Sequence, residues 1–258
     1  MAKHKLSSIV KRSLTSLVLL PLSIWVILSG APYINMAILA VGAVLAWEWV
    51  NMTPNKRPDV YGISYIVALA VVCFSMSLPH MVAVVMAMTL FVWFKARKEK
   101  HNRLLTLGVP YITIGLGSLV WMNNTAGSEF LLWFFIAVWC MDIGGYVVGC
   151  SVKGPKLAPK ISPNKTWSGL FGGMLLAAVV SYVFYALLGK NGSAMALFAL
   201  LVAFVSQVGD LVESSIKRYL RIKDTSDVIP GHGGVFDRID GLIFAAPFVV
   251  ICFKLFNF

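Results

Sequence analysis

Long apolar stretches alternate with short polar segments along the whole chain. Each stretch is roughly 17 to 22 residues long, which suits a helix that crosses the hydrocarbon core of a bilayer. We predict about nine such spans, at residues 14–31, 34–50, 60–77, 79–95, 104–122, 129–150, 169–188, 193–212 and 240–257. The pattern therefore predicts an all-α, polytopic integral membrane protein.

Composition supports this class. Hydrophobic residues make up 59% of the chain and charged residues only 13%, which leaves too little polar surface for a protein dissolved in water. No segment rich in Pro, Gly or Ser divides the sequence, so we expect residues 1–258 to form a single membrane domain. The four cysteines are scattered without the spacing of a metal site or disulfide, and we interpret them as small apolar packing residues.

The distribution of cations predicts the orientation. If the N-terminus is cytoplasmic, nearly all of the 22 Lys and Arg residues fall on the inner side and only Lys190 and Lys254 fall outside, as the positive-inside rule requires. An odd number of spans then places the C-terminus on the opposite side. The net charge of +11 is explained by topology and by anionic headgroups, so we expect no nucleic-acid partner.

The acidic residues are unevenly distributed. Within the first five spans the only one is Glu48, between Trp47 and Trp49 near the expected inner interface, where an aromatic belt is typical. We interpret residues 1–125 as scaffold helices. Residues 126–258 carry the acids near the cytoplasmic ends of the later spans and the two longest polar loops, 151–168 and 215–239, which predicts a C-terminal catalytic half.

The eighth span ends in a polar stripe. Four side chains recur at helical spacing on one face of it: Asp210, Glu213, Ser214 and Lys217. A carboxylate at membrane depth is costly and usually faces a cavity, a partner or an ion. The alternative is a structural Asp–Lys pair that closes the helix bundle.

Two more acids lie at the start of the ninth span. Asp237 and Asp240 are three residues apart, on one side of the first helical turn, while Arg238 points elsewhere. Acids at a helix N-terminus can serve simply as caps. However, Asp210 and Asp237 flank one long inner loop, and we predict that their carboxylates converge on a hard cation such as Mg²⁺.

The segment between them contains the turn Pro230-Gly231-His232-Gly233-Gly234. Glycines let backbone N–H groups approach an anion closely, although a plain tight turn would use them equally well. With the cations Lys217, Arg218, Lys223 and Arg238 on either side, the turn predicts a phosphate-binding site. His232 could bind phosphate, orient a carboxylate or satisfy the turn.

The other inner loop ends in Ser162-Pro163-Asn164-Lys165-Thr166. Ser162 is a plausible N-cap and Pro163 a plausible first residue of the seventh helix. Lys165 would then oppose the helix dipole unless an anion binds there. The alternative is ordinary flanking of a span by cations.

Ser214 to Asp240 resembles the signature of the phosphatidate cytidylyltransferase family at nearly every defined position. Lys153 to Gly169 is similar to the family's second conserved region, and Asp142 with Tyr146 forms a third matching element. The sequence departs from the family at Gly145, Cys150, Asn164 and Ser168, and the resemblance implies nucleotide or acceptor contacts near Cys150 and Ser168.

The resemblance implies transfer of CMP from CTP to phosphatidate, giving CDP-diacylglycerol and pyrophosphate, by a multi-pass enzyme of the cytoplasmic membrane whose site faces the cytoplasm. It implies Mg²⁺, with K⁺ as a second cation, on Asp210 and Asp237, and a homodimer. The catalytic residues would be Asp210, Asp237, Lys217 and Asp142. The substrate-binding residues would be Ser162, Asn164, Lys165, Thr166, Ser214, Arg218, Lys223, Asp224, His232, Gly233, Gly234, Arg238 and Asp240.

Two alternatives stay open. Related CTP-using membrane enzymes act on isoprenoid alcohols or on ether lipid phosphates, whose tails resemble acyl chains in an apolar groove. A transporter or phospholipid-binding protein could also keep the fold without turnover. Transporters often carry inverted repeats and ionisable residues near the bilayer midplane, whereas here we find no repeat and the charges gather at one face.

Overall fold

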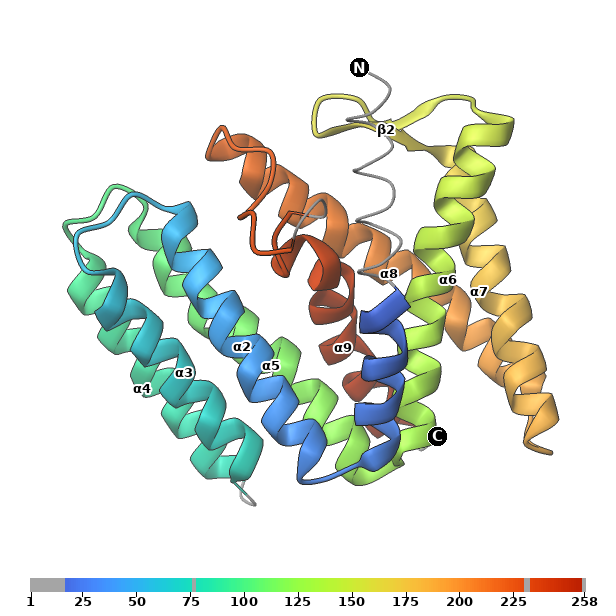
Figure 1. The fold of residues 1–258 in the computed structure, drawn as a ribbon, viewed down its shortest axis with the longest axis horizontal. Coiled ribbons are helices and arrows are strands. Elements are labelled where there is room, and N and C mark those ends of the chain that lie inside the picture. The colour runs from blue at the N-terminus through green and yellow to red at the C-terminus, as the bar shows by residue number, and fades with distance from the viewer. Residues whose placement is uncertain (1–16, 76–77, 230–232, 257–258) are drawn as a thin grey trace. The chain divides into compact units, whose positions relative to one another are not determined.

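The computed structural model describes residues 17–75, 78–229 and 233–256. A helical segment, Leu17–Ser29, precedes the labelled elements of Figure 1. In chain order these are α2 (Tyr33–Met52), α3 (Pro58–Phe74), α4 (Leu78–Ala96), α5 (Asn102–Ala126), α6 (Ser128–Val152), β1 (Lys156–Ala158), β2 (Ser162–Thr166), α7 (Trp167–Leu187), α8 (Gly192–Tyr219) and α9 (Phe236–Phe256). Among the described residues, 7 helices are long and apolar enough to cross a membrane, and Leu17–Ser29 and α3 are shorter.

The helical class predicted from the hydrophobic pattern is confirmed, and the apolar helices are those of a multi-pass membrane protein. Each predicted span coincides with a helix, while the number that cross the membrane and the side of each terminus stay predictions. The helices also extend beyond the predicted spans: α8 continues to Tyr219 and α9 begins at Phe236. The acids at the span ends therefore lie on regular helix.

The hairpin formed by β1 and β2 was not predicted. The strands pair antiparallel, with Lys156 opposite Thr166 and Ala158 opposite Ser162. In Figure 1 the hairpin lies beyond the ends of α6 and α7. It gives the loop at 151–168 a defined backbone and places Lys165 on a strand.

Two compact units make up the chain. The first comprises Met1–Ser128 and Ile222–Ile239, and the second Glu129–Arg221 and Asp240–Phe258. Residues 222–239, which contain most of the long polar loop, thus belong with the first unit, although they lie far along the sequence. That all residues form a single domain stays a prediction.

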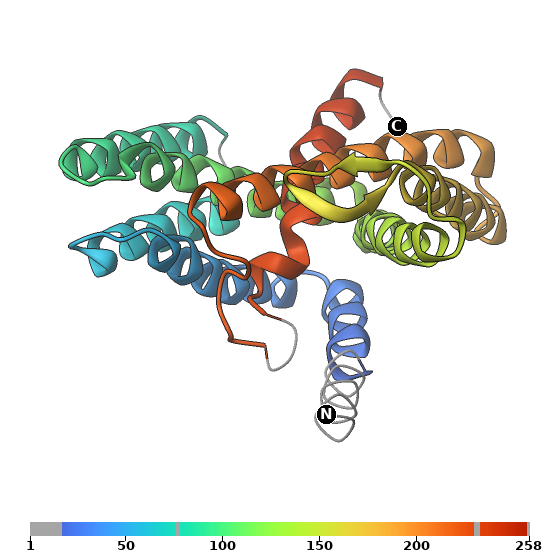
Figure 2. The same cartoon turned by 90° about the horizontal axis from the view of Figure 1, so that it is seen from above.

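Helices α2 to α5 form the body of the first unit and lie side by side in Figure 2. Trp49 is 2% exposed and its Nε1 donates to the carbonyl of Leu104 at 2.9 Å. Its ring stacks on Tyr111 with centroids 5.4 Å apart and packs against Phe236 at 5.3 Å. This aromatic cluster joins α2 and α5 to the start of α9.

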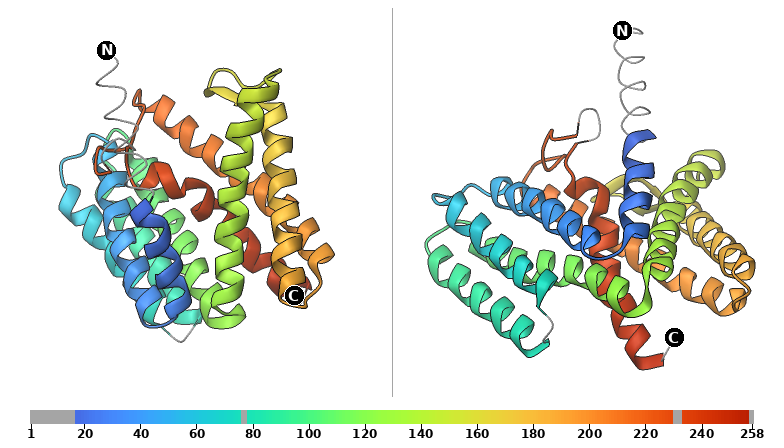
Figure 3. Two further views of the ribbon diagram at one scale, coloured as in Figure 1. Left: turned by 45° about the vertical axis from the view of Figure 1, so that its right-hand side comes forward. Right: turned by 60° about the horizontal axis from the view of Figure 1, so that its bottom comes forward.

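In the second unit α6 and α7 run alongside each other, as Figure 3 shows from two sides. Trp133 of α6 is fully buried, and its Nε1 donates to Ser181 Oγ of α7 at 2.9 Å. The same ring stacks on Phe198 of α8 with centroids 5.5 Å apart. A buried indole with a satisfied N–H therefore links three helices.

Glycines allow the backbones of α6 and α7 to touch. A Cβ on Gly144 would lie 2.9 Å from the Cα of Gly173, and a Cβ on Gly173 would lie 2.5 Å from the carbonyl oxygen of Met141. Close packing through small residues is a main source of helix association within membranes. Gly144 and Gly173 therefore allow α6 and α7 to pack closely.

We expect Gly173→Ala to destabilise the protein and Gly62→Ala not to. An added methyl at Gly173 overlaps backbone atoms that cannot move aside, whereas Gly62 has nothing within 4 Å of the added Cβ. Overpacking of this kind costs about 1–3 kcal/mol, while Ala in an open helical position is neutral or favourable. Thermal unfolding in detergent tests this, and equal midpoints for the two variants would contradict it.

Candidate functional site

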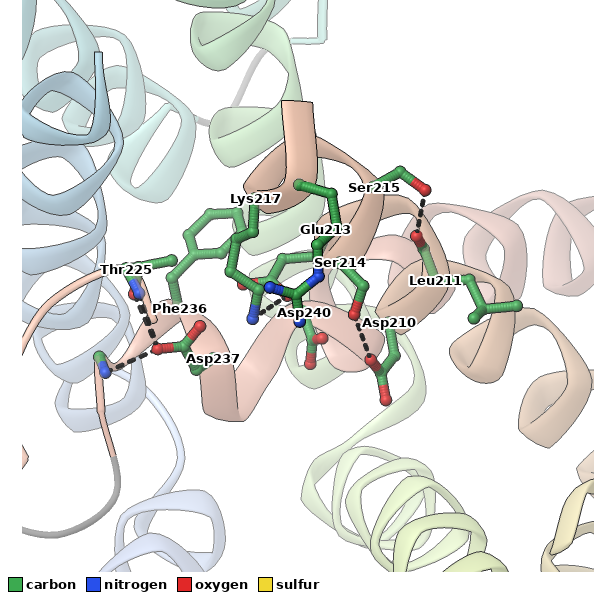
Figure 4. A network of polar contacts seen from close by, with 12 residues as sticks. Asp210, Leu211, Glu213, Ser214, Ser215, Lys217, Thr225, Phe236, Asp237 and Asp240 are labelled. Atoms are coloured by element: carbon green, nitrogen blue, oxygen red, sulfur yellow. Dashed lines mark hydrogen bonds and ion pairs between the residues drawn. The ribbon is translucent and has the colours of Figure 1, made fainter. Parts of the chain in front are cut away.

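The polar stripe of the eighth span lies on the last turns of α8. Lys217 Nζ pairs with Glu213 Oε2 at 2.6 Å, and Ser214 Oγ donates to Asp210 Oδ1 at 3.4 Å. Figure 4 shows the link between Ser214 and Asp210. Glu213 is only 2% exposed, so its charge is compensated inside the protein rather than by water.

A second pair connects α8 to the hairpin. Lys165 of β2 forms an ion pair with Asp210, and Arg218 Nε donates to the carbonyl of Ile161 at 3.2 Å. The alternative interpretation of the stripe was a structural Asp–Lys pair. Asp210 does pair with a lysine, but this lysine is Lys165 of β2 and not Lys217 of the stripe. Two contacts, about two helical turns apart on α8, hold the hairpin against this helix.

Three carboxylates of the second unit gather near this pair. Asp210, Glu213 and Asp240 each offer an oxygen, and these oxygens lie within 4.8 Å of one another. Carboxylate oxygens are the ligands that hard divalent cations prefer, so the donor set suits a metal ion. Of the two predicted metal ligands, Asp210 is in this cluster. Glu213 was recognised in the sequence only as part of the stripe.

The start of α7 differs from the prediction. Ser162 is not an N-cap and Pro163 is not the first helical residue, because Ser162–Thr166 is strand β2. The N-cap is Thr166, whose side chain accepts from Gly169 N at 3.1 Å. Strand pairing with β1 delays the helix to Trp167, so Lys165 lies before the first turn and does not oppose the dipole from within it.

Asp237 organises the loop before α9. Its Oδ2 accepts from Gly234 N at 2.8 Å, Thr225 N at 3.0 Å and Thr225 Oγ1 at 3.1 Å, and Figure 4 shows the links to Thr225. Asp237 lies in the first turn of α9, where a negative charge is favourable, but these three hydrogen bonds come from the loop before the helix, and the capping role stays an alternative. Its convergence with Asp210 on one cation stays a prediction.

Glu48 of α2 is the functional candidate that the sequence did not reveal. Its carboxylate accepts hydrogen bonds from Ser226, Val235 and Phe236. The available signal was a single acid within the first five apolar spans, which demands buried partners. Because Glu48 lies between two tryptophans, the sequence pattern indicated a residue of the membrane interface instead.

The other predicted residues are placed as follows. Asp142 lies on an exposed face of α6, as does Tyr146, which is 74% exposed. Gly233 has the positive φ of +84° that favours glycine. His232 lies outside the described residues, and the exposed members of the set are Asn164, Arg218, Lys223, Asp224 and Arg238.

Comparison with known proteins gives a consistent result. A model of the cytidylyltransferase family matches residues 10–256. Phosphatidate cytidylyltransferase of Brucella suis is 29% identical over 97% of this chain and 95% of its own. The enzyme of that name from Pseudomonas aeruginosa is 33% identical over 92% of this chain and 94% of its own. The one from Staphylococcus haemolyticus is 28% identical over 93% of this chain and 97% of its own. The chain belongs to the cytidylyltransferase family.

Proposed function

We propose that the protein transfers CMP from CTP to phosphatidate and so produces CDP-diacylglycerol and pyrophosphate. The observation that carries the proposal is the compact set of acids and cations on α8, α9 and β2 in a chain with the helices of a membrane protein. Full-length similarity to enzymes named phosphatidate cytidylyltransferase supports it.

The chemistry suits this set of side chains. The phosphate monoester of phosphatidate is already an anionic nucleophile, so its attack on the α-phosphorus of CTP needs no protein base. A new P–O bond forms to the lipid phosphate, the bond between the α-phosphorus and the bridging oxygen breaks, and pyrophosphate leaves with that oxygen. The protein must bring polyanions together and stabilise charge on the leaving group.

Asp210, Glu213 and Asp240 would hold a divalent cation, which we propose to be Mg²⁺, and Asp237 is the further ligand predicted from the sequence. A bound Mg²⁺ would neutralise phosphate oxygens of the two substrates. By family resemblance we also propose K⁺ as a second cation. All four side chains offer the hard oxygen donors that these ions prefer.

The cations would bind the phosphates. Lys165 and Lys217 each contact a carboxylate of α8, so they already lie beside the acids that the proposal assigns to metal binding. We propose that they contact the triphosphate together with Arg218 and Arg238, with hydroxyl contacts from Ser162 and Ser214. Asp142 and Asp224 would position the site.

The remaining proposals concern location and assembly. The protein would lie in the cytoplasmic membrane, as the bacterial source of its relatives suggests. Its site would face the cytoplasm, because CTP is cytosolic and the acceptor is a lipid. By family resemblance we also propose a homodimer.

Label transfer from CTP carrying a radioactive α-phosphate tests the function. The purified protein, with Mg²⁺, is offered phosphatidate, an isoprenoid alcohol and an ether lipid phosphate in parallel. We expect label in CDP-diacylglycerol and none without Mg²⁺. Label only with another acceptor would change the substrate and keep the chemistry, whereas no label with any acceptor would favour a binding or transport role.

A further inference from the structure

Glu48 is a fully buried carboxylate, 0% exposed, on the apolar helix α2. Burial of a carboxylate is strongly unfavourable unless hydrogen bonds or charges compensate it. Such a residue within a membrane helix usually serves a specific role. The identity of its partners therefore indicates what Glu48 does.

All of its hydrogen-bond donors in the described part of the chain come from the start of α9 and the loop before it. Oε1 accepts from Ser226 Oγ at 2.5 Å and from Val235 N at 2.8 Å. Oε2 accepts from Phe236 N at 2.7 Å. These partners lie 178 to 188 residues away in the sequence, so the contact connects the scaffold helices to the signature segment.

The two amides lie where a helix needs an acceptor. The first N–H groups of a helix have no partner within it, and a negative charge there is favourable. The carboxylate of Glu48 supplies both the acceptor and the charge to the N-terminus of α9, from a different helix. The side chains of Asp237 and Arg238 follow immediately.

The surroundings fit this contact closely. A Cβ at Gly234 would lie 2.7 Å from Glu48 Oε1 and 1.9 Å from Thr225 Oγ1, so any larger residue at 234 would force these side chains to shift. Phe236 is 0% exposed and packs on Trp49, the neighbour of Glu48, at 5.3 Å. Side-chain packing and hydrogen bonds thus fix the same turn.

We infer that Glu48 is a positioning residue for nucleotidyl transfer: it fixes the start of α9 and thereby the places of Asp237 and Arg238. The inference rests on the proposed function, which assigns these two residues to metal and phosphate binding. Glu48 acts through them and does not itself contact substrate.

The test is Glu48→Gln. The amide nitrogen of Gln would face a backbone N–H, so at least one hydrogen bond is replaced by two opposed donors. We expect kcat to fall about tenfold or more and the Mg²⁺ concentration for half-maximal rate to rise, with little change in KM for phosphatidate. Limited trypsin digestion should also cut faster after Lys223, within the loop.

Glu99→Gln is the matched control. Glu99 belongs to the same unit and accepts from Lys56 N at 3.2 Å and Tyr61 Oη at 3.5 Å. The variant therefore loses one acid but none of the hydrogen bonds to the loop before α9. We expect wild-type kcat, Mg²⁺ requirement and cleavage after Lys223. A loss in this variant equal to that in Glu48→Gln would overturn the inference.

Ser226→Ala provides a milder second variant, because it removes one donor and leaves both amides on Glu48. We expect about a threefold fall in kcat with the same rise in Mg²⁺ requirement, and this variant decides the matter if Glu48→Gln does not fold. Wild-type Mg²⁺ dependence and cleavage in both folded variants would overturn the inference. Absence of transfer by the wild type would refute the proposed function instead, and the cleavage rates would still decide whether Glu48 holds the loop.

Discussion

Replacement of Asp210 by Asn is expected to abolish transfer of CMP to lipid while leaving the protein folded. The carboxylate lies in the cluster with Glu213 and Asp240 and pairs with Lys165, so its loss would remove a proposed metal ligand and release a cation. Charge stabilisation of several kcal/mol at the reacting phosphates corresponds to at least about a thousandfold in rate.

Label transfer over a range of Mg²⁺ concentrations measures this effect, and size-exclusion chromatography in detergent checks the fold. Glu129→Gln is the control, because Glu129 is an exposed acid of the same unit that pairs with Lys190 at 2.8 Å. We expect this variant to retain wild-type transfer. Near-normal turnover by Asp210→Asn at moderate Mg²⁺ would exclude Asp210 as a ligand.

Asp237→Asn is expected to have a comparable effect for two reasons. The substitution removes a carboxylate that the sequence assigns to the metal, and it weakens the three hydrogen bonds that Oδ2 accepts from Gly234 and Thr225. Hydrogen bonds to a charged acceptor are each stronger than those to a neutral one. We expect transfer to fall by at least about a thousandfold.

Two further variants separate these reasons. Asp227→Asn removes an exposed acid from the same loop and should leave transfer unchanged. Thr225→Val removes one donor to Asp237 but keeps the carboxylate and both amides, and should lower transfer only a few-fold. A loss in Thr225→Val as large as in Asp237→Asn would assign Asp237 to loop structure alone.

The sequence predicted best those features that depend on local periodicity. Apolar length identified each helix, and the spacing of Asp210, Glu213, Ser214 and Lys217 placed four polar side chains on one helix face. Both signals arise from helix geometry, which repeats within a few residues. The place of Asp237 in the first turn of α9 was also within reach for this reason.

Features that depend on distant partners were missed. Ser162 and Pro163 fit a helix start by type, but pairing with β1 draws them into a strand. Glu48 has its partners 178 to 188 residues away, and a single sequence gives no sign of which segment will return to it. The partner of Asp210 was missed similarly, because Lys165 lies on another element.

The ion pairs of Lys165 with Asp210 and of Lys217 with Glu213 give the resting site its own counter-ions. Opposite charges thus compensate one another before any ligand binds. This pairing offsets the desolvation cost of side chains that are poorly exposed to solvent. Under the proposed function, arrival of the nucleotide would exchange partners: the ammonium groups would turn to phosphate, and the carboxylates to a metal. Binding would therefore exchange the counter-ions of these side chains, rather than bring the first counter-ions to a site of uncompensated charge.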